Sequence, residues 1–210
     1  MPALAVPLQL GFLASHGGSN LQSILDAIAA GTLPAQARLV ICNNSGARAL
    51  ERALAAGVPG LHLSSGTHAD PESLDAAMLA ALRGHGVELV VCAGYMRKVG
   101  RRVLAGYRNR IVNIHPALLP RFGGPGMFGL RVHQAVLAAG ERVTGVTVHL
   151  VDEVYDHGAI LAQATVPVQA GDTAEGLQAR VLETEHRLYP DALRRIARGE
   201  IDLDAAAAAR

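Results

Sequence analysis

The stretch Ile111-Val112-Asn113-Ile114-His115-Pro116-Ala117-Leu118-Leu119-Pro120 begins as an apolar run and then gains two polar side chains. Strand side chains alternate between the faces of a sheet, so Asn113 and His115 are predicted to share one face. Proline cannot donate to a strand ladder, so the strand should end before Pro116. Leaving an amide or imidazole buried and unpaired costs about 1–3 kcal/mol. Asn113 and His115 therefore each need a partner, from the protein or from a substrate.

Strand patterns alternate with helix patterns on the amino-terminal side of this stretch. Helical spacing links Leu21 to Ile28, and an Asp70-Pro71 helix start follows later. The expected strands span residues 8–14, 37–42, 60–63, 87–92 and 110–115, and another helix spans 47–56. A continuous apolar run such as 87–92 is typical of a parallel strand buried on both faces. This order predicts an α/β fold with a Rossmann-like, doubly wound, mostly parallel sheet.

The second half of the chain has a different pattern. A helix is expected at 132–139, and an antiparallel strand pair at 143–151 and 159–168. A long helix should run from about residue 173 to 198, where Gly199 ends it, and the end of the chain, 205–210, should be frayed. We expect a single domain over residues 1–210, with 1–7 and 200–210 as peripheral tails.

Composition excludes several function classes. The 210 residues carry 19 basic and 18 acidic side chains, a balance that gives no reason to expect nucleic-acid binding. No run approaches the roughly 18 apolar residues of a membrane span, and residues 1–7 do not resemble a secretory signal. Cys42 and Cys92 each lie in apolar runs, so they are interpreted as buried small hydrophobes. No His, Cys or carboxylate spacing is typical of a metal site, and a cytoplasmic protein without a membrane partner is expected.

A glycine-rich loop, Ser15-His16-Gly17-Gly18-Ser19-Asn20, joins the first strand to the first helix. Glycines let backbone N–H groups approach a ligand, and a helix N-terminus attracts anions, so phosphate binding is one interpretation. The other is a capping box made by Ser19 and Gln22, which is compatible with the first. The loop matches neither the dinucleotide fingerprint nor a Walker A sequence.

Polar groups also occur in the acidic segment 152–158 and in the last helix. The segment carries three carboxylates and could be a solvated hairpin loop. It could instead supply the carboxylate that orients His115 and stabilises its protonated form for acid–base chemistry. Glu185 interrupts an apolar stripe, which predicts either an ion pair with an arginine or contact with a ligand. His133 and His149 are interpreted as structural, with a supporting role in the site as the alternative.

Five motifs occur in a fixed order: Ser-x-x-Gly-Ser-Asn-Leu-Gln at 15–22, Ala-Gly-Tyr-Met-Arg at 93–97, Asn-Ile-His-Pro-Ala-Leu-Leu-Pro at 113–120, Gly-Val-Thr-Val-His at 145–149, and Asp156-x-Gly158. Together the chain resembles the phosphoribosylglycinamide formyltransferase family over about residues 8–198. The resemblance implies transfer of a formyl group from 10-formyltetrahydrofolate, as co-substrate, to the amine of glycinamide ribonucleotide in purine biosynthesis. It further implies small-molecule substrates, no metal, and a monomer or homodimer.

The resemblance also implies roles for individual residues. Asn113, His115 and Asp156 would be catalytic, with the first two donating hydrogen bonds to the oxyanion of a tetrahedral intermediate. The ribonucleotide would contact Gly18, Ser19, Asn20 and Glu185. The folate would contact Met96, Arg97, Lys98, Val99, Asn113, Asp152, Glu153, Val154, Tyr155 and Asp156.

The chain departs from the family pattern in three places, which affect the expected ligand affinity more than the reaction. Lys98 and Val99 stand where many relatives carry two aliphatic residues, and Pro71 stands where the family has an arginine. The segment 122–128 is longer than in the shortest relatives. The alternatives are another formyl-folate transferase or a formyltetrahydrofolate hydrolase, and, from a different class, a non-catalytic nucleotide-binding module.

Overall fold

A computed structural model describes residues 6–209, so most of the predicted 1–7 tail lies outside the described residues. Seven strands form one sheet in the order β3-β2-β1-β4-β5-β6-β7. The five parallel strands are β1 (Leu8–Ala14), β2 (Ala35–Cys42), β3 (Gly60–His62), β4 (Leu89–Cys92) and β5 (Ile111–His115). β6 (Val143–Leu150) pairs antiparallel with both β5 and β7 (Ile160–Pro167). The predicted fold class is confirmed.

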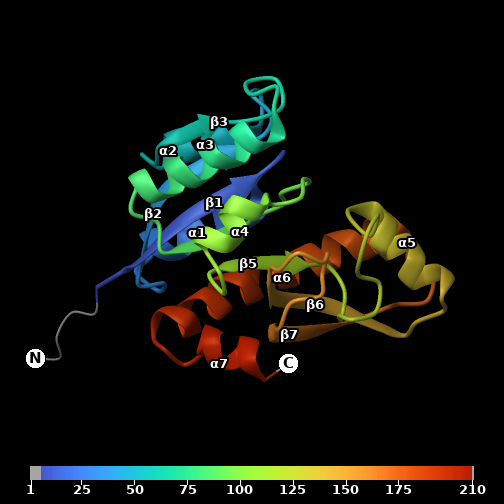
Figure 1. The fold of residues 1–210 in the computed structure, drawn as a ribbon. Coiled ribbons are helices and arrows are strands. Elements are labelled where there is room, and N and C mark those ends of the chain that lie inside the picture. Colours follow the sequence, from blue (N-terminus) through green and yellow to red (C-terminus); the bar gives the residue numbers. More distant parts are fainter. Residues whose placement is uncertain (1–5, 210) are drawn as a thin grey trace, which may run out of the picture.

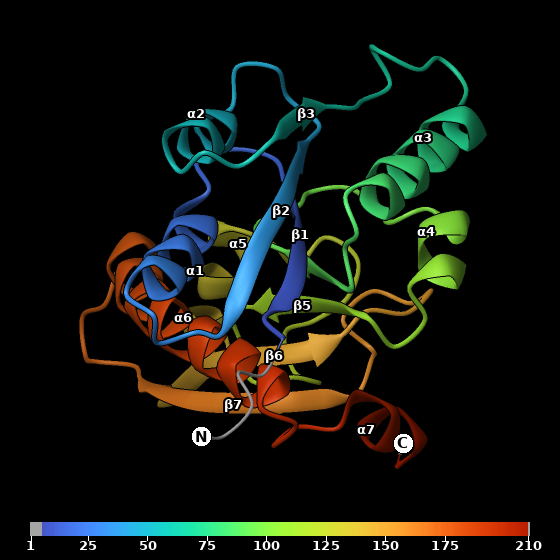
Figure 2. The ribbon, with the colours of Figure 1, turned by 90° about the vertical axis from the view of Figure 1, so that its left-hand side faces the viewer.

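Helices cover both faces of this sheet (Figures 1 and 2). One layer contains α1 (Ser19–Ala29), α2 (Arg48–Ala55), α5 (Leu130–Ala138) and α6 (Ala174–Ala197). The other contains α3 (Pro71–Gly84) and α4 (Arg101–Gly106). Each layer buries its own apolar cluster against the sheet, as the doubly wound architecture requires.

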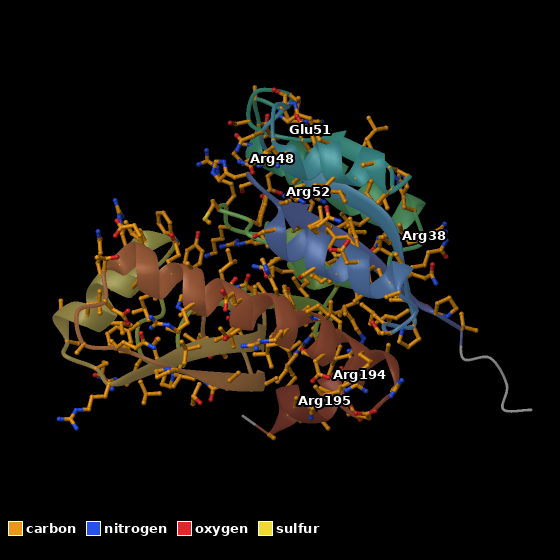
Figure 3. The ribbon with its side chains drawn as sticks, turned by 180° about the vertical axis from the view of Figure 1, so that it is seen from behind. Arg38, Arg48, Glu51, Arg52, Arg194 and Arg195 are labelled. Carbon is orange, nitrogen blue, oxygen red and sulfur yellow. The ribbon has the colours of Figure 1, made fainter. Side chains whose placement is uncertain are left out.

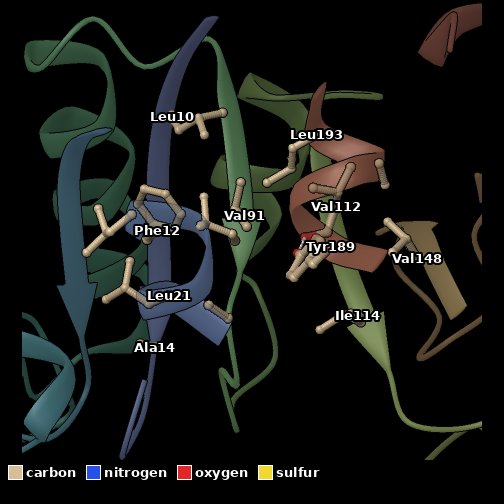
Figure 4. Close-up of a cluster of buried hydrophobic side chains, with 14 of the residues drawn as sticks. Leu10, Phe12, Ala14, Leu21, Val91, Val112, Ile114, Val148, Tyr189 and Leu193 are labelled. Carbon is tan, nitrogen blue, oxygen red and sulfur yellow. Dashed lines mark hydrogen bonds between the residues drawn. The ribbon is translucent and has the colours of Figure 1, made fainter. Parts of the chain in front are cut away.

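The first apolar cluster fixes the centre of the molecule. Phe12 and Leu21 pack together beside Val91, and Tyr189 of α6 lies over β5 (Figure 4). Tyr189 is fully buried, and its hydroxyl oxygen lies 3.1 Å from the carbonyl oxygens of both Cys92 and Val112. A buried tyrosine needs such a partner, so this contact ties α6 to β4 and β5, the two strands that lead into the candidate site.

The start of α1 contradicts the predicted capping box. Gly18, not Ser19, is the N-cap residue, and no side chain caps the helix. Gly18 has a φ of 67°, which glycine adopts without strain, so the chain turns one residue earlier than the motif predicts. Gln22 instead donates to Asp26 and accepts from Arg52.

The carboxyl-terminal end is more ordered than the sequence suggests. Residues 205–208, predicted to be frayed, belong to α7 (Leu203–Ala208). Asp202 caps this helix, Leu203 is buried against the first apolar cluster, and Asp204 accepts from Arg110 at the start of β5. α7 has only six residues and one buried apolar side chain, so its sequence carries no helical periodicity that would predict it.

Candidate active site

A cavity of about 850 Å³ opens beyond the carboxyl ends of β1, β4 and β5. Strand order reverses between β1 and β4, and ligands bind open α/β sheets at such a switch point. The predicted site residues in its lining are Ser19, Asn20, Met96, Arg97, Lys98, Val99, Asn113, His115, Asp152, Glu153, Val154, Tyr155, Asp156 and Glu185. The structure therefore brings together side chains from opposite ends of the sequence.

The alternation predicted for β5 is confirmed. Val112 and Ile114 pack into the first apolar cluster, and Asn113 and His115 line the cavity, which Ile114 also reaches at the end of the strand. In the antiparallel register with β6, Asn113 faces His149 and His115 faces Thr147. Cross-strand partners share a face of the sheet, so β6 adds its own polar side chains to the same wall.

His115 lies between two acceptors. Its Nδ1 is 3.5 Å from Asp156 Oδ2, and its Nε2 is 2.8 Å from the carbonyl oxygen of Phe122. Both the histidine and the aspartate side chains are almost completely buried. Oδ2 of Asp156 also accepts a hydrogen bond from the backbone N–H of Gly124 at 2.9 Å. An imidazolium donates at both nitrogens, so this arrangement accommodates the protonated ring.

The backbone beside His115 is held in an unusual conformation. Phe122 and Asp156 have φ values of 57° and 54°, in the left-handed region that non-glycine residues seldom adopt. A Cβ at Gly123 would lie 3.1 Å from the Asp156 Cβ and closer still to Leu119, so the two loops meet at a glycine. Such strain clusters at functional sites, because the surrounding structure must hold the reactive groups in place.

Glu185 meets Asn20 at the other end of the cavity. Asn20 Nδ2 donates to Glu185 Oε2 at 2.6 Å, joining α1 to α6. Burial raises the pKa of Glu185, and the hydrogen bond from Asn20 partly opposes that shift. The arginine ion pair considered as an alternative is thus replaced by an amide. Asn20 Oδ1 is buried and has no hydrogen-bond partner among the described residues, so it remains available for a donor from a ligand.

The glycine-rich loop is supported from behind by α2. Arg52 projects from α2 (Figure 3). Its Nε donates to the carbonyl oxygen of Gly17 at 2.8 Å, and the N–H of Ala49 donates to the carbonyl oxygen of His16. Gly18 lies against Ala49 and is not part of the cavity lining, unlike Ser19 and Asn20. Of the three residues predicted to bind the phosphate, Ser19 and Asn20 at the start of α1 therefore line the cavity, and Gly18 does not.

Residues 96–99 and 152–156 form the opposite wall. The backbone N–H of Met96 donates to Ser15 Oγ at 2.7 Å, which links this wall to the glycine-rich loop. The Lys98 ammonium lies 5.8 Å from the centre of the Tyr155 ring, within the range of a cation–π interaction. Lys98, the departure from the family pattern, thus connects the two loops that form this wall.

The cavity lining also includes His133 and His149, which the sequence alone predicts to be structural. Both are buried, and burial lowers the pKa of each, to about 4 for His133. The sequence signal for His149 was its alternation with Val148, but that signal becomes informative only once the register with β5 is known. Across residues 6–209, no three His, Cys, Asp or Glu side chains gather where they could hold a metal ion.

Comparisons with known proteins show the family of the chain. The profile of the Formyl transferase family matches residues 8–193. A phosphoribosylglycinamide formyltransferase of Bacillus subtilis is 36% identical over 183 residues, which are 87% of this chain and 91% of that protein. A chloroplastic phosphoribosylglycinamide formyltransferase of Vigna unguiculata is 42% identical over 182 residues, but the chain spans only 58% of its length.

Solved structures give the same picture. Glycinamide ribonucleotide transformylase 1 of Symbiobacterium toebii superimposes with a TM-score of 0.86 at 44% identity, covering 92% of this chain and 89% of that one. A phosphoribosylglycinamide formyltransferase of Brucella melitensis gives 0.84 at 44% identity, covering 91% and 96%. A formyltetrahydrofolate deformylase of Pseudomonas syringae, at 23% identity, shares the fold alone.

Within residues 6–209, no helix has the length and apolar character to cross a membrane.

Proposed function

Because the chain belongs to the formyl transferase family, we propose that it transfers a formyl group from 10-formyltetrahydrofolate to the amine of glycinamide ribonucleotide in purine biosynthesis. The observation that carries this proposal is the group of Asn113, His115 and Asp156 in the lining of the cavity, with Asp156 Oδ2 3.5 Å from His115 Nδ1. A hydrolase would not need the Asn20–Glu185 end of the cavity, and a nucleotide-binding module would not need the trio.

The two ends of the cavity suit the two substrates. The start of α1, whose first N–H groups have no partner within the helix, would bind the phosphate of the ribonucleotide beside Ser19 and Asn20. Glu185 would accept hydrogen bonds from the ribose hydroxyls. Backbone groups of residues 96–99 and 152–156 would recognise the donor and acceptor edge of the pterin, which places the formyl group between the two ends.

The chemistry follows from charge development. Attack of the amine nitrogen on the formyl carbon forms a C–N bond and moves the carbonyl electron pair to oxygen. Collapse of this intermediate breaks the bond between the formyl carbon and N10 of the folate, and the proton lost by the amine is transferred to N10 as tetrahydrofolate leaves. The Asn113 amide can donate to that oxyanion, and removal of one such donor costs about 10²–10³ in rate. Protonated His115, stabilised by Asp156, supplies the second donor. Its Nε2–H is bonded to the Phe122 carbonyl here, so donation to the intermediate requires an exchange of this hydrogen bond.

An absorbance assay of 10-formyltetrahydrofolate consumption, with and without glycinamide ribonucleotide, tests the proposal. Consumption of 10-formyltetrahydrofolate should require the ribonucleotide and yield the ribonucleotide with its amine formylated. Asp156→Asn should lower kcat by about 10²-fold or more and leave thermal unfolding nearly unchanged, because the amide oxygen can still accept from Gly124. Asp191→Asn, the same change on the outside of α6, is the control.

Three outcomes would contradict the proposal. Consumption that does not depend on the amine would indicate a hydrolase. No consumption under either condition would indicate a binding module. Wild-type turnover in Asp156→Asn would remove Asp156 from the mechanism.

A further inference from the structure

His149 lines the cavity beside Asn113 and makes three polar contacts. It lies at the carboxyl end of β6, 2% exposed, where the pairing with β7 shifts register between Val148 and His149. Such irregularities redirect side chains beside active sites. Its Nδ1 is 2.7 Å from the carbonyl oxygen of Leu150, and its Nε2 is 3.1 Å from Asn113 Nδ2 and 3.6 Å from Asp156 Oδ1.

The Leu150 contact decides where the imidazole carries its proton. A carbonyl oxygen can only accept, so Nδ1 must be the protonated nitrogen. In the neutral ring Nε2 is then an acceptor, and the nearest donor is the Asn113 carboxamide. Burial lowers the pKa of His149, which favours this neutral form over the imidazolium.

We propose that His149 is a positioning residue that fixes the Asn113 carboxamide with its NH2 group toward Nε2. This inference rests on the proposed formyl transfer, since it concerns how one oxyanion donor is aimed. An amide NH2 carries two protons, so one is donated to His149 and the other stays available for the oxyanion. With Nε2 protonated, the amide would turn its oxygen toward the ring, which would change the orientation of that donor.

The neighbouring glycine supports the same assignment. A Cβ on Gly158 would lie 1.8 Å from the carbonyl oxygen of Leu150, the atom that accepts from His149. The Leu150 N–H in turn donates to the carbonyl oxygen of Ala159 at 2.9 Å. Gly158, in the segment that presents Asp156, therefore leaves the space that the Leu150 carbonyl occupies.

Two substitutions separate positioning from packing. His149→Gln places an amide near the Nε2 position and can still accept from Asn113. His149→Asn places its amide near Nδ1, so it keeps the donor to Leu150 and loses the acceptor. We expect His149→Asn to lower kcat by about 10²-fold with KM nearly unchanged, and His149→Gln to retain most of the activity. In an Asn113→Ala background, His149→Asn should cause no further loss of kcat.

An NMR measurement tests the inference even if formyl transfer is absent. Long-range ¹H–¹⁵N correlation spectra, assigned by loss of signals in His149→Gln, should show His149 as the neutral Nδ1–H tautomer at pH 7. An Nε2–H tautomer or an imidazolium would overturn the inference. So would equal loss of kcat in the two variants in proportion to their loss of thermal stability, or additive effects in the Asn113→Ala background. Failure of the proposed function would appear separately, as absence of turnover in the wild-type protein.

Discussion

Burial sets the protonation state of His133 in the cavity lining. His133 is 1% exposed, its Nδ1 has no hydrogen-bond partner among the described residues, and it lies near His115. Desolvation is the largest cause of its low pKa, and the positive charge available to His115 adds to the effect. His133 is therefore neutral near pH 7.

The low pKa of His133 predicts a dependence of stability on pH. Its pKa is about 4 in the folded protein and about 6.5 in the unfolded chain, so the unfolded chain binds the extra proton first. The contribution is fully present above about pH 6.5 and is lost as pH falls toward 4. It amounts to at most about 3 kcal/mol. Urea unfolding at pH 7 and pH 5 should show a smaller fall for His133→Gln than for the wild-type protein.

Other groups act alongside His133, so the comparison with the variant is essential. His149 and His186 have lowered pKa values and contribute with the same sign, whereas the raised pKa of Glu185 acts in the opposite direction. These contributions remain in His133→Gln. Equal falls in the unfolding free energy of the two proteins would show that His133 does not carry the shift.

Short elements can depend on a side chain from elsewhere in the chain. α4 begins at Arg101, and no side chain of its own caps it. The buried carboxylate of Asp75, in α3, accepts from the backbone N–H groups of Arg102 at 2.6 Å and Val103 at 3.2 Å. Gly100 leaves the space that this carboxylate occupies, because a Cβ there would lie 2.1 Å from it. The start of α4 therefore depends on Asp75, a residue of another helix.

Asp75→Ala should destabilise the protein by about 2 kcal/mol, the upper end for a lost helix cap, because two N–H groups lose their buried acceptor. It should also raise the KM for the folate, since α4 follows directly on the wall formed by residues 96–99. Urea unfolding and steady-state kinetics measure the two effects. Glu72→Ala removes an exposed ion pair to Arg102 from the same helix and should cost about 0.5 kcal/mol. Equal costs for the two variants would contradict the capping role.

At the scale of the whole molecule, the sequence predicts what depends on local periodicity. The strand alternation at 111–115 correctly placed Asn113 and His115 on the cavity face, and the acidic loop correctly suggested a carboxylate for His115. Features that depend on tertiary contacts could not be predicted. The start of α4 needs Asp75, the helix 203–208 needs the surface beside β5, and the role of His149 needs the β5–β6 register. The predicted capping box is wrong because Gly18, one residue before Ser19, takes the N-cap position with a positive φ.

The architecture also divides the proposed substrates between two parts of the sheet. The ribonucleotide end is built from α1, α2 and α6, and the folate end from the loops after β4 and β6. Arg52 acts on the first end alone, because its guanidinium holds the Gly17 carbonyl and Gln22 at 2.8 Å each. That contact keeps the loop carbonyl turned toward α2, so the N–H groups at the start of α1 can face the cavity.

Arg52→Met removes both hydrogen bonds and should therefore weaken ribonucleotide binding by roughly tenfold, while folate binding stays unchanged. Isothermal titration calorimetry with each substrate separately measures the two affinities. Arg48→Met removes the same charge one turn earlier in α2 and controls for a long-range effect on the phosphate (Figure 3). If the two variants weaken the ribonucleotide equally, the effect is one of net charge. If Arg52→Met weakens the binding of both substrates, the two ends of the cavity are not independent. The hydrogen bond from Met96 N–H to Ser15 Oγ is then the contact that couples them.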